Sequence, residues 1–213
     1  MKVELIDSMG DDVSVVNAAR ASFDRTTDVL REKDVRLLNY LARHNHWTPF
    51  AQVQIQVRVC APFFIARQWF KHCVGTTRNE VSRRYVDGPW EFWLPEVVRG
   101  RPENAKQGSS GPLPDDAQET ALELMRSVYV VAEKSYDHMI RMGVAPEQAR
   151  AVIPMGAYTT WVETMSLATA ARICRQRTDD HAQAEIRELA EQLHALADSL
   201  FPHSMAALMG NNE

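Results

Sequence analysis

A strict alternation of apolar and polar side chains over residues 51–60, AQVQIQVRVC, is the clearest periodic pattern in the chain. The odd positions from Val53 to Val59 are apolar, whereas the even positions from Gln52 to Arg58 are polar. Because successive side chains of a strand point to opposite faces, the pattern predicts a strand with one apolar and one polar face.

Helices are predicted where apolar residues recur every three or four positions. The predicted helical segments are residues 11–23, 34–44, 63–72, 115–142 and 146–152, a run from Pro154 to about Arg177, and a last helix with apolar residues from Ala182 to Leu200. Asp179 or Asp180 is expected to cap the last helix. Pro49 follows the helix over 34–44 and marks a break, because the residue before a proline disfavours helical backbone.

Residues 99–114, RGRPENAKQGSSGPLP, are expected to form a loop, because they are rich in Gly, Pro and Ser. The 213 residues show no internal repeat and are enough for one domain with a sizeable core. We therefore expect a single domain over residues 1–213 with a helix-rich α+β fold around a small, mostly antiparallel sheet.

The composition is that of an ordinary globular protein, with 45% hydrophobic and 24% charged residues. No apolar run reaches the roughly 20 residues that a transmembrane helix needs, so no membrane partner is expected. The N-terminal sequence MKVELID carries acids where a signal peptide would be apolar. These features favour a cytoplasmic protein.

Several classes of site lack support in the sequence. Three cysteines in no CxxC pair argue against a disulfide framework and a zinc site, and His44 and His46 have no third metal ligand at a suitable spacing. No Gly-rich dinucleotide motif, P-loop or nucleophile elbow occurs. The net charge of -4 argues against nucleic-acid binding. An anionic ligand would therefore need a local basic cluster.

One such cluster lies over residues 67–85, RQWFKHCVGTTRNEVSRRY, where six basic or potentially basic side chains accompany a single acid, Glu80. Two interpretations are open. The segment binds a phosphate or pyrophosphate through charge-assisted hydrogen bonds, or it is a solvated basic loop. Asn79, Ser82 and Tyr85 favour a binding site, because they supply neutral hydrogen bonds for a base or sugar.

A second basic cluster consists of Arg172, Arg175 and Arg177 at the end of a predicted helix. Arginines in this position often only complement the partial negative charge of the helix C-terminus. The sequence alone therefore leaves both a binding role and a purely local role open.

Together these segments resemble the flavin-dependent thymidylate synthase family. The family signature, Arg-His-Arg followed by Ser, Asn, Ser and Arg, is matched by KHCVGTTRNEVSRRY over 71–85. Upstream, ARASF over 19–23 and HWTPF over 46–50 resemble flavin-contacting segments of the family. Downstream, Ala149-Arg150 and Arg177 with the following DHAQ segment stand in the expected order. The resemblance covers roughly residues 1–200, and five ordered segments are more specific than any one.

The resemblance implies an α+β homotetramer whose sites are built from several subunits. It also implies FAD reduced by NADPH, and methylenetetrahydrofolate as the carbon donor, so folate is an expected partner. No protein nucleophile attacks the pyrimidine in this family, so Ser82 would bind the nucleotide. The residues expected to bind the pyrimidine nucleotide are Gln68, Ser82, Arg83, Arg84, Arg150 and Arg177, of which Arg177, Arg84 and Ser82 are the catalytic candidates. The residues expected around FAD are Ser22, His46, Thr48, Lys71, His72, Arg78, Asn79, Glu80, Ser166, Arg172 and His181.

The chain departs from the family pattern near the expected flavin site. Lys71 and Cys73 replace the two arginines of the Arg-His-Arg triplet, and one extra residue lies between His72 and Asn79. Ser166 and Arg172 stand where the family has asparagines. Charge from nearby arginines, Arg78 among them, is expected to compensate for the lost arginines.

The function expected from this resemblance is C5-methylation of dUMP to dTMP by a flavin-dependent methyltransferase. The same chemistry on UMP or another pyrimidine nucleotide, as in nucleoside-antibiotic C5-methylases, remains an alternative. A hydroxymethylase and a non-catalytic nucleotide-binding homologue are further alternatives.

Overall fold

The computed structural model describes residues 1–86, 88–103 and 108–210. Part of the predicted loop over 99–114 thus lies outside the described residues. The described strands are β1 (Lys2–Met9), β2 (Gln54–Pro62), β3 (Thr76–Glu80) and β4 (Tyr158–Ser166), which form one antiparallel sheet in the order β1-β2-β4-β3. The helices are α1 (Asp12–Arg20), α2 (Glu32–Arg43), α3 (Phe63–Trp69), α4 (Asp115–Arg141), α5 (Pro146–Ala149), α6 (Leu167–Arg177), α7 (Ala184–Leu200) and α8 (Pro202–Met209). Short 3-10 turns are η1 (Ala21–Phe23), η2 (Pro49–Ala51) and η3 (Arg150–Val152).

These elements confirm the predicted helix-rich α+β fold with a small antiparallel sheet. The alternating segment over 51–60 forms most of β2, and its apolar positions, from Val53 to Val59, are at most 1% exposed. The strand begins only at Gln54, because Pro49 directs the preceding residues into the η2 turn.

The predicted helical run from Pro154 to Arg177 is wrong in its first half, where residues 158–166 form β4. Its sequence, YTTWVETMS, is rich in aromatic and β-branched residues, and buried side chains recur at every second position from Thr159 to Met165. Two of the buried positions, Thr159 and Glu163, are polar. The sequence therefore lacks the alternation of apolar and polar residues that predicts a strand. Strands β1 and β3 and helix α8 were not predicted either.

The predicted cap of the last helix is also wrong, because α7 begins after Gln183. Asp179 instead accepts a hydrogen bond from the backbone of His181 at 2.8 Å, and Asp180 pairs with Arg187 at 3.4 Å. Asp179 therefore stabilises the turn before α7, and Asp180 links this turn to a side chain near the start of the helix.

The chain divides into two compact units, which are described separately. The first unit comprises Met1–Val59, Phe70–Asn79 and the described part of Trp161–Glu213, and the second comprises Cys60–Trp69 and the described part of Glu80–Thr160. The prediction of a single domain over residues 1–213 stays a prediction.

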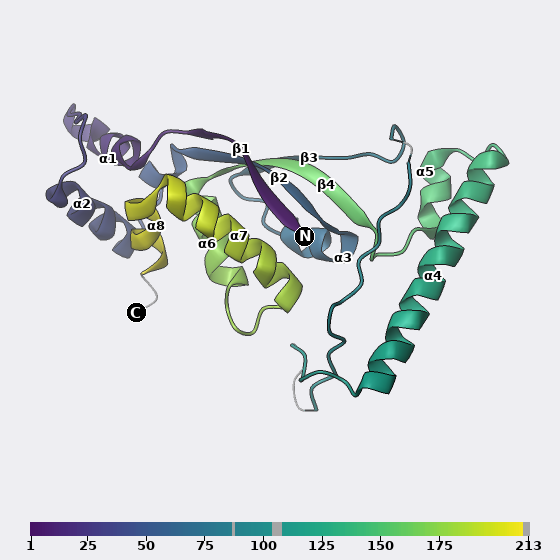
Figure 1. Ribbon diagram of the computed structural model, residues 1–213. Coiled ribbons are helices and arrows are strands. Elements are labelled where there is room, and N and C mark those ends of the chain that lie inside the picture. Colours follow the sequence, from purple (N-terminus) through teal and green to yellow (C-terminus); the bar gives the residue numbers. More distant parts are fainter. Residues whose placement is uncertain (87, 104–107, 211–213) are drawn as a thin grey trace. The chain divides into compact units, whose positions relative to one another are not determined.

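In the first unit, α6 packs against α7, α2 against α8, and α7 against β1, as can be followed in Figure 1. The core between these elements is fully buried and includes Leu38, Trp161, Ile173, Leu189 and Phe201. This core gives β4 and α6 a fixed place, and both elements carry polar residues of the candidate site.

In the second unit, α4 packs against α5 and η3, and a small core forms around Trp90, Tyr136, Ala149 and Ala157. The Trp90 and Tyr136 rings meet edge to face with centroids 5.4 Å apart. This core holds the segment after β3 and the turn from α5 to β4.

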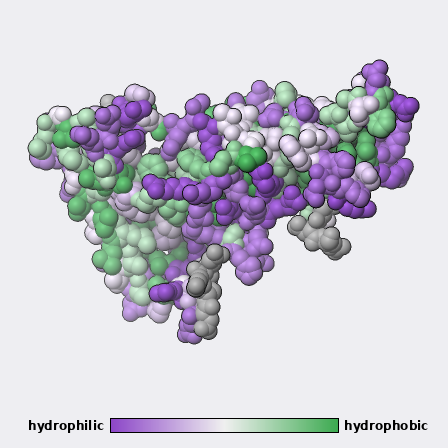
Figure 2. Space-filling model, turned by 180° about the vertical axis from the view of Figure 1, so that it is seen from behind, coloured by the Kyte–Doolittle hydropathy of each residue, from purple (hydrophilic) through white to green (hydrophobic). Residues whose placement is uncertain are grey.

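Helix α4 also carries an exposed apolar stripe. Leu124, Val128 and Val131 are 64%, 54% and 64% exposed, and their spacing places them on one face of the helix. Figure 2 shows hydrophobic side chains gathered along the side occupied by α4. No described helix is both long and apolar enough to cross a membrane.

Candidate functional site

A buried carboxylate on β4 organises polar side chains of the first unit. Glu163 has no exposed surface. It accepts hydrogen bonds from Thr76 Oγ1 at 2.7 Å and Trp161 Nε1 at 3.0 Å, and it forms an ion pair with Arg78 Nη2 at 2.8 Å. Burying a charge is costly unless it is paired and hydrogen-bonded, so these donors explain how Glu163 is accommodated. We call these four residues the Glu163 network.

The arginine of this network also binds the turn that precedes β3. Arg78 donates to the carbonyl oxygens of Phe70 (3.4 Å) and His72. Its guanidinium lies 5.2 Å from the centroid of the Phe70 ring. The side chain is 17% exposed, so Arg78 mainly contacts protein groups.

His72 is held in a neutral state next to a second arginine. Its side chain is buried, and Nε2 accepts a hydrogen bond from Arg177 Nε at 3.0 Å. Burial and the positive charges of Arg177, Arg172 and Arg78 lower the pKa of His72 from 6.5 to about 4, although Glu163 opposes the shift. A neutral imidazole can accept this bond, so His72 positions the Arg177 guanidinium.

The start of α6 packs against the same turn. Ser166 is the N-cap of α6 and accepts from the backbone of Thr169 at 3.3 Å. Arg172 Nη2 and Thr169 Oγ1 both donate to the carbonyl oxygen of Val74, at 2.6 and 3.0 Å. Gly75 has a φ of 75°, and a Cβ there would collide with Thr169 Oγ1. The first unit therefore brings His72, Arg78, Ser166, Arg172 and Arg177 to one turn.

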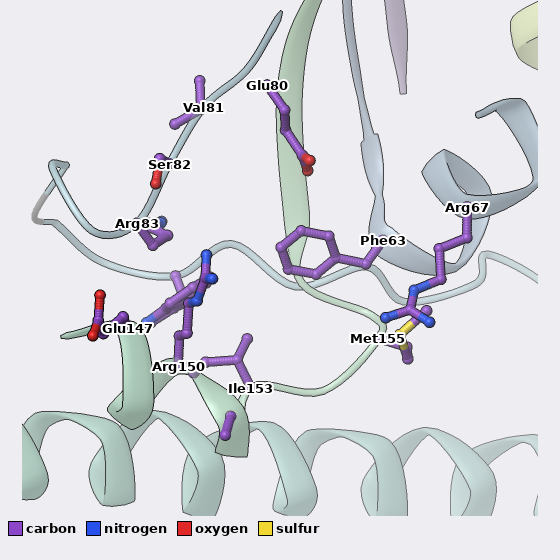
Figure 3. A pocket seen from close by; sticks show the side chains of 12 residues that line it. Phe63, Arg67, Glu80, Val81, Ser82, Arg83, Glu147, Arg150, Ile153 and Met155 are labelled. Carbon is purple, nitrogen blue, oxygen red and sulfur yellow. The ribbon is translucent and has the colours of Figure 1, made fainter. Parts of the chain in front are cut away.

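The second unit contains a cavity of about 480 Å³, shown in Figure 3. Arg67 reaches it from α3, Glu147 from α5, and Arg150 from η3. Residues 80–83, at and after the end of β3, form another wall, and the apolar lining is Phe63, Val81, Trp90, Ala151, Ile153 and Met155. A second cavity of about 370 Å³ shares Phe63, Val81 and Arg83 with the first.

The charged groups of the larger cavity differ in how far they are bound by the protein. Arg83 lies 4.1 Å from the centroid of the Trp90 ring and donates to the carbonyls of Gly88 and Pro89, both at 3.0 Å. Glu80 accepts from Thr159 Oγ1 at 2.7 Å. By contrast, within the described ranges no hydrogen bond or ion pair engages the guanidinium of Arg67 or Arg150.

Ser82 and Arg84 form a small polar turn beside this cavity. Ser82 Oγ accepts from the backbone N–H of Arg84 at 3.3 Å and from its Nε at 3.5 Å. The Arg84 guanidinium lies 5.1 Å from the Tyr85 ring centroid, and both side chains are exposed. Of the residues expected to bind the nucleotide, the second unit thus holds Gln68, Ser82, Arg83, Arg84 and Arg150, and the first unit holds Arg177.

The other residues expected around FAD are spread over the first unit, except Glu80 in the second. Ser22, Thr48, Lys71 and Asn79 are exposed. His46 belongs to a ring cluster with Tyr40 and His44, with centroids 6.2 and 6.4 Å away. The side chain of His181 is likewise exposed. Among the described residues, no group of His, Cys, Asp or Glu side chains could hold a metal ion.

Sequence reasoning did not assign a role to Glu163, Glu147 or Arg67. A single carboxylate between Trp161 and Met165, in a segment rich in β-branched and aromatic residues, was an available signal for Glu163. A buried acid in such a segment requires a cationic partner. Arg67 was counted only as part of the basic cluster over 67–85, and Glu147 carries no comparable signal, because only the fold brings α3 and α5 to one cavity.

Comparison with known proteins gives a consistent match over nearly the whole chain. The sequence model of the family described as "Thymidylate synthase complementing protein" matches residues 4–203. A flavin-dependent thymidylate synthase from Thermus thermophilus is 39% identical over 205 residues, which are 96% of this chain and 74% of that protein. One from Thermosipho africanus is 36% identical over 207 residues, which are 97% of this chain and 90% of that protein.

A solved structure is similar at the level of the fold and of the sequence. The UMP/dUMP methylase PolB from Streptomyces cacaoi, bound with 5-Br dUMP, has a TM-score of 0.87 and 28% identity, covering 98% of this chain and 94% of that chain. The structure of PolB bound with 5-Br UMP also has a TM-score of 0.87, with 27% identity.

Proposed function

The chain belongs to the flavin-dependent thymidylate synthase family and is an enzyme of this kind, and from this premise we propose that it methylates C5 of the uracil ring of a uridine monophosphate. In the main form of the proposal the substrate is dUMP, methylenetetrahydrofolate donates the carbon, and NADPH reduces FAD. The observation that carries the proposal is the cavity of the second unit, where Arg67 and Arg150 face a space of about 480 Å³ without protein partners among the described residues.

The charge and shape of this cavity suit a nucleotide phosphate. Arginine binds phosphate through two parallel charge-assisted hydrogen bonds, and an arginine that is already bound to the protein cannot offer both. Arg67 and Arg150 retain this capacity, whereas Arg83 uses two N–H groups on backbone carbonyls. Ser82 and the Arg84 turn add hydrogen-bonding groups for the sugar and phosphate.

The first unit carries donors that fit the diphosphate of FAD. The side chains of Lys71 and Arg175 have no hydrogen bond or ion pair within the described part of the chain, and Arg172 commits one nitrogen to Val74. Arg78 adds little, because its charge is paired with Glu163. When bound and reduced, FAD would supply the hydride that completes the methyl group.

In this proposal Arg177 stabilises negative charge on a uracil carbonyl oxygen as the ring reacts. Its Nε–H donates to His72, and its two terminal nitrogens make no hydrogen bond among the described residues. The side chain is thus fixed through Nε, and its two terminal nitrogens can donate to a substrate oxygen, which suits this role. Arg84 is the second candidate for charge stabilisation, and Ser82 binds the nucleotide without attacking it.

UMP is a second candidate substrate, and one observation favours it. PolB, whose structure covers 98% of this chain, is named a UMP/dUMP methylase and was solved with bromo derivatives of both nucleotides. A single 2′-hydroxyl distinguishes the two substrates.

We further propose that the enzyme is a homotetramer. The exposed stripe of Leu124, Val128 and Val131 on α4 supports burial against another copy of the chain. Leu124→Glu places a charge in this stripe and should produce a smaller species in light scattering, whereas Glu123→Gln, its exposed neighbour, should not. An unchanged mass for Leu124→Glu would contradict a role of this stripe in assembly.

The reaction is tested by incubating the protein with FAD, NADPH and methylenetetrahydrofolate, together with equal amounts of dUMP and UMP. Mass spectrometry distinguishes a methylated from a hydroxymethylated product and identifies the sugar in the same sample. A methylated nucleotide is the expected product. Folded, flavin-loaded protein that converts neither nucleotide would overturn the proposal and favour a nucleotide-binding homologue.

Two variants test the assigned roles. Arg84→Ala should raise the nucleotide KM or abolish turnover with little loss of stability, because this exposed side chain packs against no core. Ser82→Ala should keep measurable activity, since no covalent step is assigned to Ser82. A trapped covalent adduct between Ser82 and the nucleotide would disprove the mechanism.

A further inference from the structure

The turn over residues 70–75 is fixed by protein groups at its backbone carbonyls. Arg78 donates to the carbonyls of Phe70 and His72, and Arg172 and Thr169 donate to that of Val74. The backbone N–H of Ser166 donates to the carbonyl of Gly75 at 3.2 Å. The side chain of His72 therefore lies on a turn whose backbone is held at four carbonyls.

Arg78 has little capacity left for a ligand. Nη2 binds Glu163 and the His72 carbonyl, Nη1 binds the Phe70 carbonyl, and Nε is buried without a hydrogen-bond partner in the described structure. Only 17% of the side chain is exposed. A phosphate could not reach two of its N–H groups without displacing these contacts.

Glu163 in turn fixes Arg78 from the protein interior. The carboxylate is fully buried, and Thr76 and Trp161 hold its two oxygens, Oε1 and Oε2, in place. The Arg78 guanidinium is thus oriented by a rigid acceptor on β4. From that position it reaches back to the turn that carries His72.

We propose that Arg78, anchored on Glu163, is a positioning residue that holds the 70–75 turn so that His72 Nε2 orients the guanidinium of Arg177. The charge of Arg78 is neutralised by Glu163 and serves to fix geometry. The lowered pKa of His72 agrees with this arrangement, because only the neutral imidazole accepts the Arg177 hydrogen bond. The consequence for catalysis rests on the proposed function, in which Arg177 acts on the uracil ring.

The test uses the full-length protein and the side-chain NMR signals of His72, assigned by their loss in His72→Gln. The key variant is the double substitution Arg78→Met with Glu163→Gln, which removes both charges and so leaves no unpaired buried charge. We expect the ¹⁵N signal of Nε2 to shift as the Arg177 hydrogen bond is lost. The pKa of His72 should rise as the Arg177 guanidinium moves away, whereas the charges of Arg78 and Glu163, which act on this pKa in opposite directions, are removed together. Unchanged His72 signals would overturn the proposal.

Arg78→Lys separates positioning from charge alone. Lysine keeps a positive charge beside Glu163 but lacks the planar fork that reaches two carbonyls and a carboxylate together. We expect it to retain thermal stability better than Arg78→Met and yet to show the displaced His72 signal. Wild-type signals and wild-type turnover in Arg78→Lys would show that charge is sufficient, which contradicts a positioning role.

Kinetics test the catalytic consequence. In the double variant kcat should fall by about tenfold or more, while the dissociation constant of 5-bromo-dUMP changes less than about threefold, because the phosphate-binding arginines of the second unit are unaltered. Leu193→Ala, a core truncation on α7 in the same unit, is the control for lost stability and should leave kcat and the His72 signals unchanged.

The positioning role of Arg78 and the proposed function are distinguished by different results. If the His72 signals shift but kcat stays at the wild-type value, the catalytic role of this positioning is wrong. If the wild-type enzyme itself does not methylate dUMP or UMP, the proposed function fails, and the NMR comparison still decides whether Arg78 positions His72.

Discussion

Three arginines of the first unit and two of the second differ in what they are bound to. In the first unit, Arg78, Arg172 and Arg177 each donate to a protein acceptor, namely Glu163, the Val74 carbonyl and His72. In the second unit, Arg67 and Arg150 line a cavity and have no such acceptor among the described residues. The same side chain therefore fixes a turn in one unit and remains available to an anion in the other.

This difference shows why a count of basic residues does not define a binding site. A guanidinium that is bound to a buried carboxylate carries no net charge toward a ligand, and its N–H groups are occupied. Arg78 was expected to supply positive charge in place of the arginines replaced by Lys71 and Cys73. Because its charge is paired with Glu163, Arg78 instead contributes by holding the backbone of the preceding turn.

The largest effect on stability is expected in the first unit, where the arginines are bound to protein acceptors. Glu163→Ala leaves the mostly buried Arg78 unpaired and removes the acceptor of Thr76 and Trp161, so the free energy of unfolding should fall by about 3 to 5 kcal/mol. Urea denaturation measures this loss. A variant as stable as the wild type would show that the Glu163 network does not hold the first unit together.

The matching substitution in the second unit should affect binding and not folding. Arg150→Met removes a guanidinium that has no partner in the described part of the protein, so nucleotide affinity should fall by about 10- to 100-fold, while the melting temperature stays near that of the wild type. Calorimetric titration with dUMP measures the affinity. Glu147→Gln on the adjacent helix is the control, and it should bind at least as well, because it removes a negative charge from the cavity.

The pH dependence of stability is a further test of the first unit. The pKa of His72 is about 4 in the folded protein and 6.5 in the unfolded chain, so between these values the unfolded state binds more protons. The contribution of His72 is therefore complete above pH 6.5 and is lost as the pH falls toward 4, at about 1.4 kcal/mol per pH unit.

His72→Gln should remove this part of the pH dependence, because glutamine remains neutral and can still accept from Arg177. Unfolding free energies at about pH 7.5 and about pH 5 in both proteins provide the comparison. An equal loss of stability in the two proteins would show that His72 is not the titrating group.

The smallest effect is expected at the N-cap of α6. Ser166→Ala removes the acceptor of the Thr169 backbone N–H and should cost about 1 kcal/mol of stability. Ser166→Asp keeps a capping oxygen and is the matched control. If Ser166 also binds FAD, as the family resemblance implies, flavin affinity should fall in Ser166→Ala, and an unchanged affinity would limit its role to capping.

The elements that the sequence predicted correctly are those whose signal is local. The alternation over residues 51–60 specifies β2, and helical spacing over 115–142 specifies α4, because burial of one face imposes a period on neighbouring residues. The order of the family segments identified the family without any structure. Strand β4 was missed because Thr159 and Glu163 are buried polar residues, and their partners, Glu80 and Arg78, lie far away in the sequence.

The sequence by itself determined the family, the helix-rich fold class and which residue types are available for binding anions. The tertiary structure decided which arginine is bound to a protein acceptor. Arg78 pairs with Glu163 and Arg177 donates to His72, whereas Arg150 lines a cavity. The physical reason is that a charge is a property of one residue, whereas desolvation and pairing depend on groups that only folding brings within a few ångströms.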